Sequence, residues 1–535
     1  MKKFLALFIS ALMAVATFTL AGCNNKNKIP NNIVADKYKI TVACQTEMGE
    51  EEVLRVLKNT YEQKHSDVEV EIKTFSGDDF EQYMLGIAAY QSSSPNIIWT
   101  ADTYHSQWDE YFVDLRPYYE ASEETDYGNY YETMLDTAST NGYFKPTKNY
   151  TGSFRSDDLD ANSDGYEDYK HHSEYGLYYA PRDYNKPALL CNTHLFSELD
   201  TAYERVYKEK NEVTEMPESY VSSSARLNAI VSGEDWDELG DLFVFARFVA
   251  EKIVYIVNNS TDRNLSRTWN NRAVLNLFLE WEPTYTTIMN DLGIDLILDD
   301  GTFNAAEHKS ALEDLHAKML PSADDYEEQL AGIMMTTTSG IQFSSGNLFM
   351  TVCSRPVVLG YSNTFKGSYG DPSLEAIRFP VDDIAAGNSG YAISNIWEGK
   401  GMTVDGVYKS YTELSWDFIK FIITEEGQEA ASATGLNIPV LKKLYSADTN
   451  GGVEPTWRQV TALGDMHHDA WVAGGELRQD TFNIFIPRKR NSFRTITRTF
   501  FTSFQKTNYN DGSLDTLISN TLKNYNNQGP STSLR

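Results

Sequence analysis

The sequence predicts an α/β protein built as two lobes, and three observations lead to this prediction. Strand-like and helix-like segments alternate through the first hundred or so residues, which favours parallel strands with helices on the sheet faces. The chain has 535 residues, far more than one ordinary domain. Its composition, 41% hydrophobic and 23% charged, is typical of a globular protein.

Residues 1–22 are predicted to be a signal peptide. Lys2 and Lys3 precede an apolar run at residues 4–20, and the small pair Ala21-Gly22 leads to Cys23. This order is typical of a secretion signal, and the run is short for a membrane span. The ending resembles the lipobox of bacterial lipoproteins, which implies cleavage before Cys23, a diacylglyceryl group on its thiol and an acyl chain such as palmitate on its amine. The alternative is a plain secretory signal with a chance cysteine.

Such a lipid would tether the mature protein to the outer face of the cell membrane, because several acyl chains anchor stably. We expect an extracytoplasmic protein whose residues 23–36 form a linker between lipid and fold. Beyond the signal, no segment is apolar enough to cross a bilayer.

The overall charge restricts the partners. The chain carries 76 acidic and 46 basic residues, a net charge of -30. Such a surface repels nucleic acid and anionic headgroups, favours neutral or cationic ligands, and tolerates calcium. Aromatic residues reach 13%, and their mixed apolar and polar surfaces suit a protein core or the faces of sugars.

Three cysteines besides Cys23 lie in apolar, strand-like runs. They are Cys44, Cys191 and Cys353. Either all three are buried free thiols, or two form a disulfide and one is left over. We favour free thiols, which behave as small hydrophobic side chains.

The first lobe is predicted to begin with a strand at residues 38–43. A helix follows at 50–65, then a strand at 68–72, a helix at 78–90 and a buried strand at 96–99 that places Trp99 in the core. In parallel sheets, ligands bind beyond the carboxyl ends of the strands. This points to Glu47 and Asp102, which follow the first and third strands.

A polar insertion at residues 118–174 contains a candidate calcium loop. Oxygen-bearing side chains occupy its first, third, fifth and ninth positions, and Gly165 occupies the sixth, where the turn needs glycine. The twelfth position departs from the pattern, because His171 replaces the usual glutamate and Glu174 would have to complete the shell. The alternative is an acidic surface loop. The predicted ligands are Asp160, Asn162, Asp164, Tyr166 and Asp168.

The remaining chain shows no internal repeat and predicts further short strands and amphipathic helices. The predicted strands are 187–192, 348–352, 377–380 and 390–394, with a polar segment at 182–185 before the first. The predicted helices are parts of 195–231, then 235–250 capped by Asp235, 273–292, 308–320, 415–433 ended by Gly435, 495–508 and 514–525. Residues 526–535 are expected to fray.

These segments together resemble bacterial extracellular solute-binding proteins of the sugar-binding class, the receptors of ABC importers. The segment Trp416 to Val440, with Thr424-Glu425-Glu426-Gly427-Gln428, is the most specific part. The two insertions and the altered calcium loop are departures. The other segments that carry the resemblance are the Ile40 strand with its helix, Ser94-Pro95-Asn96-Ile97-Ile98-Trp99, Tyr175-Gly176-Leu177-Tyr178 with Pro181 and Asn192, Trp236-Asp237-Glu238-Leu239, and residues 343–350.

The resemblance implies a two-lobed periplasmic-binding-protein-like fold (type II), with a ligand cleft closed by a hinge. We place chain crossings near residues 181–187, 340–346 and 390–397. Lobe 1 is then expected at 37–183 plus 345–392, and lobe 2 at 184–344 plus 393–525. The expected ligand-binding residues are Glu47, Asp102, Arg182, Asn185, Trp281 and Trp397.

The resemblance also implies a non-enzymatic function. A monomeric receptor would capture a carbohydrate, such as an oligosaccharide, and deliver it to an ABC permease. Two alternatives stay open. One is a lipid-anchored glycan-degrading enzyme that uses paired carboxylates, although no nucleophile elbow, HExxH or phosphate loop is present. The other is a sensor-type solute receptor.

Overall fold

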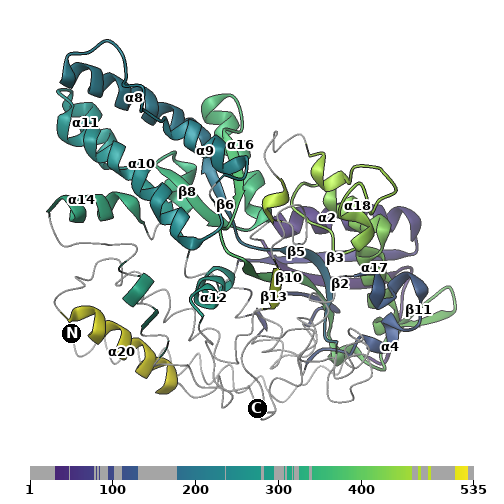
Figure 1. Cartoon of the computed structure of the whole chain (residues 1–535). Coiled ribbons are helices and arrows are strands. Elements are labelled where there is room, and N and C mark those ends of the chain that lie inside the picture. Colours follow the sequence, from purple (N-terminus) through teal and green to yellow (C-terminus); the bar gives the residue numbers. More distant parts are fainter. Residues whose placement is uncertain are drawn as a thin grey trace, which may run out of the picture.

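Two bodies, each built around one of the two larger β-sheets, dominate the described part of the chain (Figure 1), which also contains a small three-stranded sheet. None of the described helices is long and apolar enough to cross a membrane. The computed structural model describes residues 30–46, 49–76, 80, 83–84, 94–101, 111–130, 177–234, 236–278, 282–293, 307, 310–311, 313–315, 317, 325–336, 340–460, 468–471, 480–483 and 512–527.

The first sheet confirms the predicted strand-helix-strand start. Strand β2 (Tyr38–Gln45) pairs in parallel with β3 (Val68–Phe75) on one side and β4 (Ile97–Ala101) on the other. Helix α2 (Glu50–Lys64) connects β2 to β3 and buries the predicted apolar face, including Val53, Leu57 and Tyr61. Trp99 is in the core as expected. The described positions of the next predicted helix are helical, with Phe80 and Met84 buried.

Three strands from later in the chain complete this sheet. Strand β10 (Asp383–Ile393) runs antiparallel to β4 and to β5 (Ala180–Asn185), and its first residues pair with β13 (Asp480–Asn483). The register puts Ser389 opposite both Ala101 and Asp183. The end of β5 therefore lies at the same edge as the carboxyl ends of β2 and β4.

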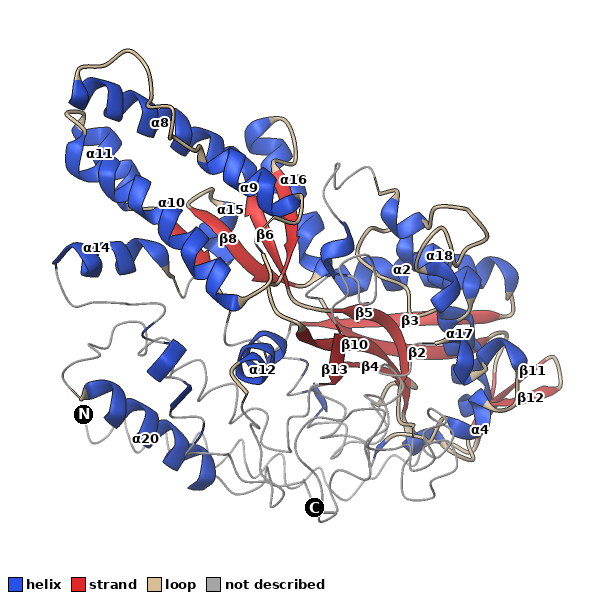
Figure 2. Ribbon diagram, viewed as in Figure 1, coloured by secondary structure: helices blue, strands red, loops and turns tan. Residues whose placement is uncertain are grey.

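The second sheet has the order β7-β8-β6-β9. Its strands are β7 (Ala273–Asn276), β8 (Leu348–Cys353), β6 (Ala188–Asn192) and β9 (Leu374–Arg378). All five residues of β6 are buried, and they alternate between two cores. Leu189 and Cys191 join the core beneath the long helices α8 (Thr193–Asn211) and α10 (Leu239–Asn259), whereas Ala188 and Leu190 join the core that extends through the first lobe. These helices lie together in Figure 2.

In the described part of the chain, two short connections lie side by side and join the sheets. Lys186 and Pro187 link β5 to β6, and residues 379–382 link β9 to β10. They lie next to each other because Ala188 pairs with Arg378 on one side of the connections and Asn185 pairs with Gly387 on the other. The first connection confirms the predicted crossing near residues 181–187.

The other two predicted crossings, and with them the predicted lobe boundaries, are wrong. Residues 340–346 lead through α15 (Gly340–Ser344) into β8 and stay with the second sheet, and β10, which ends at Ile393, stays within the first. Residues 345–378 thus belong to lobe 2. Helices α17 (Tyr411–Ile423) and α18 (Glu425–Ser432) belong to lobe 1, where Tyr61 of α2 donates to Asp417 at 2.8 Å and Lys64 pairs with Glu426 at 2.6 Å.

Several predicted element boundaries also need correction. Helix α10 begins at Leu239 after Glu238, which forms a capping box with Asp241, so Asp235 is not its cap. Residues 273–276 form strand β7 rather than helix, and the helix there is α12 (Glu282–Asp291). The predicted helix at 415–433 is two helices that break at Thr424. Gly435 follows the second helix with a φ of 79°, a left-handed conformation that suits glycine.

The predicted linker and tail are partly structured. Residues 32–34 form β1 (Asn32–Val34), which pairs with β11 (Gly401–Val404), and the predicted closing helix α20 (Ser513–Asn527) extends two residues into the expected tail. The insertion at 195–231 is helical in part, as predicted. The remaining elements are β12 (Val407–Ser410), α4 (Arg116–Tyr119), α9 (Ser223–Val231), α11 (Arg263–Asn270), α14 (Asp325–Met334), α16 (Val358–Tyr369), η6 (Glu123–Thr125), η7 (Tyr127–Asn129), η9 (Arg355–Val357), η10 (Asn395–Trp397), η11 (Lys442–Leu444), η12 (Thr456–Arg458) and η14 (His468–Trp471).

We expect Ser410→Ala to lower the free energy of unfolding by about 1 kcal/mol at pH 7. Ser410 caps α17: its hydroxyl accepts from the Glu413 N–H at 3.1 Å, and the Glu413 carboxylate accepts from the Ser410 N–H at 2.8 Å. These bonds to Ser410 lower the pKa of Glu413. The stabilisation is therefore present above the unfolded pKa of about 4.3 and is lost as the pH falls below it.

Urea unfolding at pH 7 and pH 3 checks this prediction. Thr201→Ala is the control, because that hydroxyl only donates to the Ser197 carbonyl within α8. A Ser410→Ala deficit as large at pH 3 as at pH 7 would contradict the role of the Glu413 carboxylate.

Candidate functional site

The edge of the first sheet that faces the lobe connections gathers the segments that the sequence singled out. Gln45 ends β2, Ala101 ends β4, and Asn185 ends β5 directly before the connecting residues. Helix α12 approaches the same edge, because the hydroxyl of Thr287 accepts from the N–H of Ala385 in β10 at 2.9 Å. Glu47, Asp102 and Trp281 adjoin these segments in sequence but lie outside the described residues, as does the side chain of Asn185.

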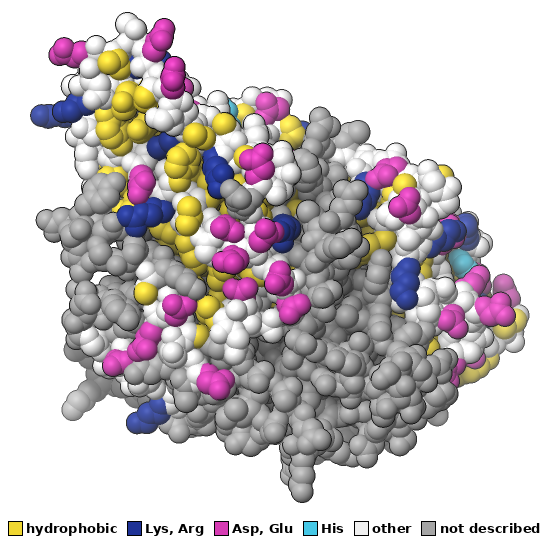
Figure 3. All heavy atoms as spheres, viewed as in Figure 1, with side chains coloured by type: hydrophobic (Ala, Val, Ile, Leu, Met, Phe, Trp, Pro, Cys, Tyr) yellow, Lys and Arg dark blue, Asp and Glu magenta, His cyan; other side chains and the backbone are white. Residues whose placement is uncertain are grey.

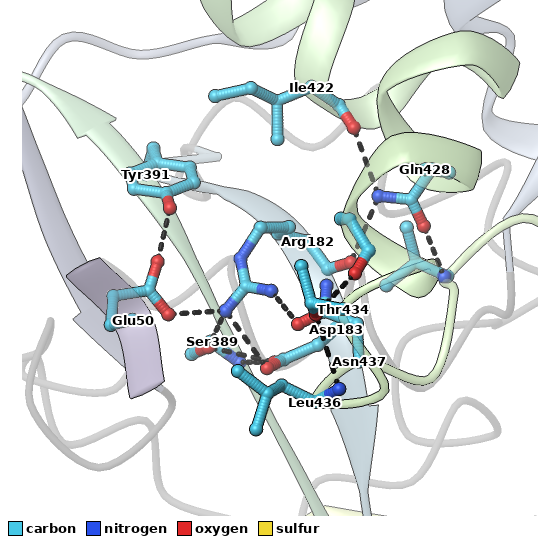
Figure 4. A network of polar contacts seen from close by, with 12 residues as sticks. Glu50, Arg182, Asp183, Ser389, Tyr391, Ile422, Gln428, Thr434, Leu436 and Asn437 are labelled. Carbon is cyan, nitrogen blue, oxygen red and sulfur yellow. Dashed lines mark hydrogen bonds and ion pairs between the residues drawn. The ribbon is translucent and has the colours of Figure 1, made fainter. Parts of the chain in front are cut away.

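Arg182 is an interior residue rather than a ligand contact, which corrects the prediction. Its side chain is 2% exposed, and its guanidinium donates to Glu50, Asn437 and, at 3.1 Å, Asp183. Figure 4 shows this network between α2, β5, β10 and the loop after α18. The guanidinium thus joins four parts of the first lobe, and the protein itself occupies most of its hydrogen-bonding capacity.

The carboxylates around Arg182 are held from both sides. The hydroxyl of Tyr391 donates to Glu50, and Ser389 donates to Asp183 from both its N–H and its hydroxyl at 2.8 Å. Burial alone would lower the pKa of Arg182, but Glu50 and Asp183 raise it above its ordinary value. The group therefore stays charged and buried at every physiological pH.

Trp397 also lies away from the predicted site. It follows β10, whose last residue Ile393 pairs with Ile97, the first residue of β4. This is the edge opposite Ala101 and the connections. The indole N–H of Trp397 donates to the carbonyls of Ser94 and Pro95 at 3.2 and 3.0 Å, and its ring packs 4.6 Å from that of Tyr411. Trp397 thus holds η10 against the residues that precede β4.

The predicted lipid site and calcium loop lie outside the described residues. These are Cys23, Asp160, Asn162, Asp164, Tyr166 and Asp168. Among the described residues, no group of three or more histidine, cysteine or carboxylate side chains could hold a metal ion. The predicted thiols Cys44, Cys191 and Cys353 are buried and free, which confirms that prediction, and burial raises the pKa of each.

A second buried arginine lies at the carboxyl end of β8. Arg355 is fully buried, and its Nη2 donates to the carbonyl of Trp457 at a long 3.4 Å, while the ring of Trp471 lies 5.6 Å from the guanidinium carbon. Burial lowers its pKa to about 9, so it remains protonated at neutral pH. Arg355 was not among the predicted site residues, although a charged residue shortly after an apolar strand was an available signal.

A separate hollow of about 410 Å³ lies between α8 and α11 in the second lobe. Inside it, Arg272 stacks over Trp269 at 4.2 Å and pairs with Glu198 at 2.8 Å. The ion pair with Glu198 joins the segment after α11 to α8. The hollow is thus part of the helical layer and not of the sheet edge described above.

Solved structures similar to this chain are solute-binding proteins. The ABC substrate-binding protein Lmo0181 from Listeria monocytogenes, in complex with cycloalternan, is 13% identical with a TM-score of 0.57, over 92% of this chain and 98% of that one. The GacH receptor of Streptomyces glaucescens is 11% identical with a TM-score of 0.54, over 92% and 100% of the two chains. This chain has their two-lobed fold. Maltose-bound MalE3 of T. maritima is 12% identical with a TM-score of 0.51, over 91% and 97%.

This likeness confirms the predicted type II periplasmic-binding-protein-like fold. No protein-family model matches the chain, and no curated protein matches it in sequence.

Proposed function

We propose that this chain is an extracytoplasmic receptor that captures a carbohydrate, such as an oligosaccharide, and delivers it to the permease of an ABC importer. The observation that carries the proposal is the likeness in fold over at least 91% of the chain to receptors solved with cycloalternan, acarbose and maltose. Such proteins bind and do not catalyse, and we propose the same here.

The described geometry supports ligand capture between the lobes. The carboxyl ends of β2 and β4 and the end of β5 meet beside two short connections, and a rotation about these would close the lobes over that edge. Closure excludes water, which strengthens hydrogen bonds to sugar hydroxyls and stacking on aromatic rings. Glu47, Asp102, Asn185 and Trp281 stay our proposed contacts, because their segments adjoin this edge.

Isothermal titration calorimetry of the purified chain against a glycan panel tests the proposal. We expect at least one oligosaccharide to bind with micromolar or better affinity and to remain intact after incubation. Binding of peptides or polyamines alone would overturn the carbohydrate assignment, and cleavage of the glycan would revive the enzymatic alternative.

Membrane attachment is part of the same proposal. A lipid on Cys23 would hold a monomeric receptor at the outer face of the cell membrane, close to its permease. Acidic and basic side chains are interspersed on the face seen in Figure 3. With a net charge of -30, the protein surface would not itself adhere to anionic lipid, so we assign attachment to the anchor.

We also propose that the loop at residues 160–168 binds a structural calcium ion. Removing calcium with EDTA should lower the melting temperature by several degrees and leave sugar affinity unchanged, because the loop belongs to an insertion. Asp164→Ala, which removes one carboxylate, should melt at the lower temperature with or without EDTA. Identical melting curves for the wild-type chain in calcium and in EDTA would contradict this site.

A further inference from the structure

The interior of this protein holds a cation that no carboxylate neutralises within the described part of the chain. Arg355 is 0% exposed, and its one hydrogen bond among the described residues, to the Trp457 carbonyl, is long at 3.4 Å. Its Nε and Nη1 have no partner among the described residues. A guanidinium carries five N–H donors, so most of its capacity is unused.

Arg182 shows how this protein pairs a buried guanidinium, and Arg355 differs from it. Both guanidinium groups are buried, but Arg182 contacts two carboxylates and an amide oxygen. A buried charge without a partner costs several kcal/mol, and buried charges in proteins are therefore paired or used. The chain neutralises Arg182 within its fold, and Arg355 lacks any such arrangement in the described residues.

Arg355 lies where the two lobes meet. It comes two positions after Cys353, which pairs with Ala188, the first residue beyond the connection at 186–187. Its hydrogen-bond acceptor, Trp457, belongs to η12, which the first lobe holds because Thr456 donates to Glu429 of α18. Arg355 thus projects from the carboxyl end of a second-lobe strand onto the first lobe, beside the connections.

We propose that Arg355 binds the carboxylate of a sugar acid, so that the ligand of this receptor is an acidic, uronate-containing oligosaccharide. This inference rests on the proposed function and specifies its ligand. Separation of the lobes breaks the weak bond to Trp457 and exposes the guanidinium. A carboxylate then accepts two parallel hydrogen bonds from the planar fork, a geometry that lysine cannot offer.

The net charge of the protein does not oppose this contact. Exposed charges are screened beyond about 8 Å at physiological ionic strength. The field at a buried carboxylate is set by its immediate neighbours, and here the described neighbours are a guanidinium, the Trp457 carbonyl and the Trp471 ring. The surface charge should slow association of an anion and leave the bound complex largely unaffected.

Calorimetry with charge-matched probes tests the inference. The acidic probes are oligogalacturonate and oligoalginate, and the neutral probes are galacto- and malto-oligosaccharides of the same length. We expect at least one acidic probe to bind on the order of 100-fold more tightly than any neutral one, and Arg355→Gln to remove that preference. Arg458→Gln is the matched control, because Arg458 stacks on Trp457 at 4.6 Å but pairs with Glu454, and it should keep the preference.

The outcomes separate this inference from the function on which it rests. Neutral probes that bind as tightly as the acidic ones, or an acidic preference that survives Arg355→Gln, would overturn the role of Arg355 and leave carbohydrate capture intact. Absence of binding to all probes would overturn both. Arg355→Lys retains the charge and serves if Arg355→Gln fails to fold; it should lose most of the preference because it lacks the fork.

Discussion

Arg182→Met should lower the free energy of unfolding by about 3–5 kcal/mol at neutral pH. The change removes the only described cation that contacts Glu50 and Asp183, and both carboxylates are buried. It also frees Asn437 in the loop after α18 from its guanidinium partner. Chemical denaturation followed by circular dichroism measures the loss, with Arg205→Met, an exposed position on α8, as the control that should change little.

The Arg182→Met defect should depend on pH in a defined direction. Burial raises the pKa of Glu50, and Arg182 opposes that rise, so removing Arg182 raises it further. The folded variant then binds a proton that the unfolded chain has released above a pKa of about 4.3. Its stability falls as the pH rises through this window, and the deficit should be smaller at pH 5 than at pH 8. A deficit independent of pH would contradict an unpaired Glu50 as its source.

Gly390→Ala should be comparably severe, with a loss of about 3 kcal/mol or more. Gly390 lies at the irregularity where β10 passes β5, and a Cβ there would overlap the carbonyl oxygen of Ala180 and lie 2.8 Å from the Cα of Pro181. Both obstacles are backbone, so relief requires the two strands to separate. Because β5 carries Arg182 and leads to the lobe connection, we expect ligand affinity to fall together with the melting temperature.

Gly360→Ala is the matched control for Gly390→Ala. Gly360 lies within helix α16, and a Cβ there would meet no atom within 4 Å. Replacing a helical glycine by alanine should raise stability by about 0.5–1 kcal/mol. Opposite shifts in the melting temperatures of the two variants would confirm close backbone approach as the cause, whereas equal losses would contradict it.

Local patterns in the sequence predicted most elements of the first sheet. The alternation at Val68, Val70 and Ile72 and the helical spacing of Val53, Leu57 and Tyr61 reflect burial on one face, which a strand or helix displays in its own residues. The division into lobes was not available in this way. Strand β8 reads as a buried strand whichever sheet it joins, and only its pairing with Cys191 and Leu190 assigns it to the second.

The candidate site could be predicted only by its position in the topology. The rule that ligands bind beyond strand ends led to the segments after β2 and β4, which the structure places at one edge with the end of β5. This rule did not distinguish Arg182, whose charge is neutralised within the fold, from Arg355, which contacts no carboxylate among the described residues. Whether a buried arginine is neutralised depends on Glu50 and Asp183, contacts that fold together from distant segments, and the sequence does not display them.

The two connections between the sheets in the described part of the chain also restrict how the lobes can move. Two residues span at most about 7 Å, so the segment at 186–187 permits rotation but little translation. Displacement then increases with distance from an axis through the connections. A ligand end next to the axis, where Arg355 lies, is enclosed similarly at every angle of opening. At the rim of the lobes far from the axis, the space around a sugar unit widens most as the lobes open. Selection by chemical identity would therefore occur near the axis, and selection by chain length at the rim.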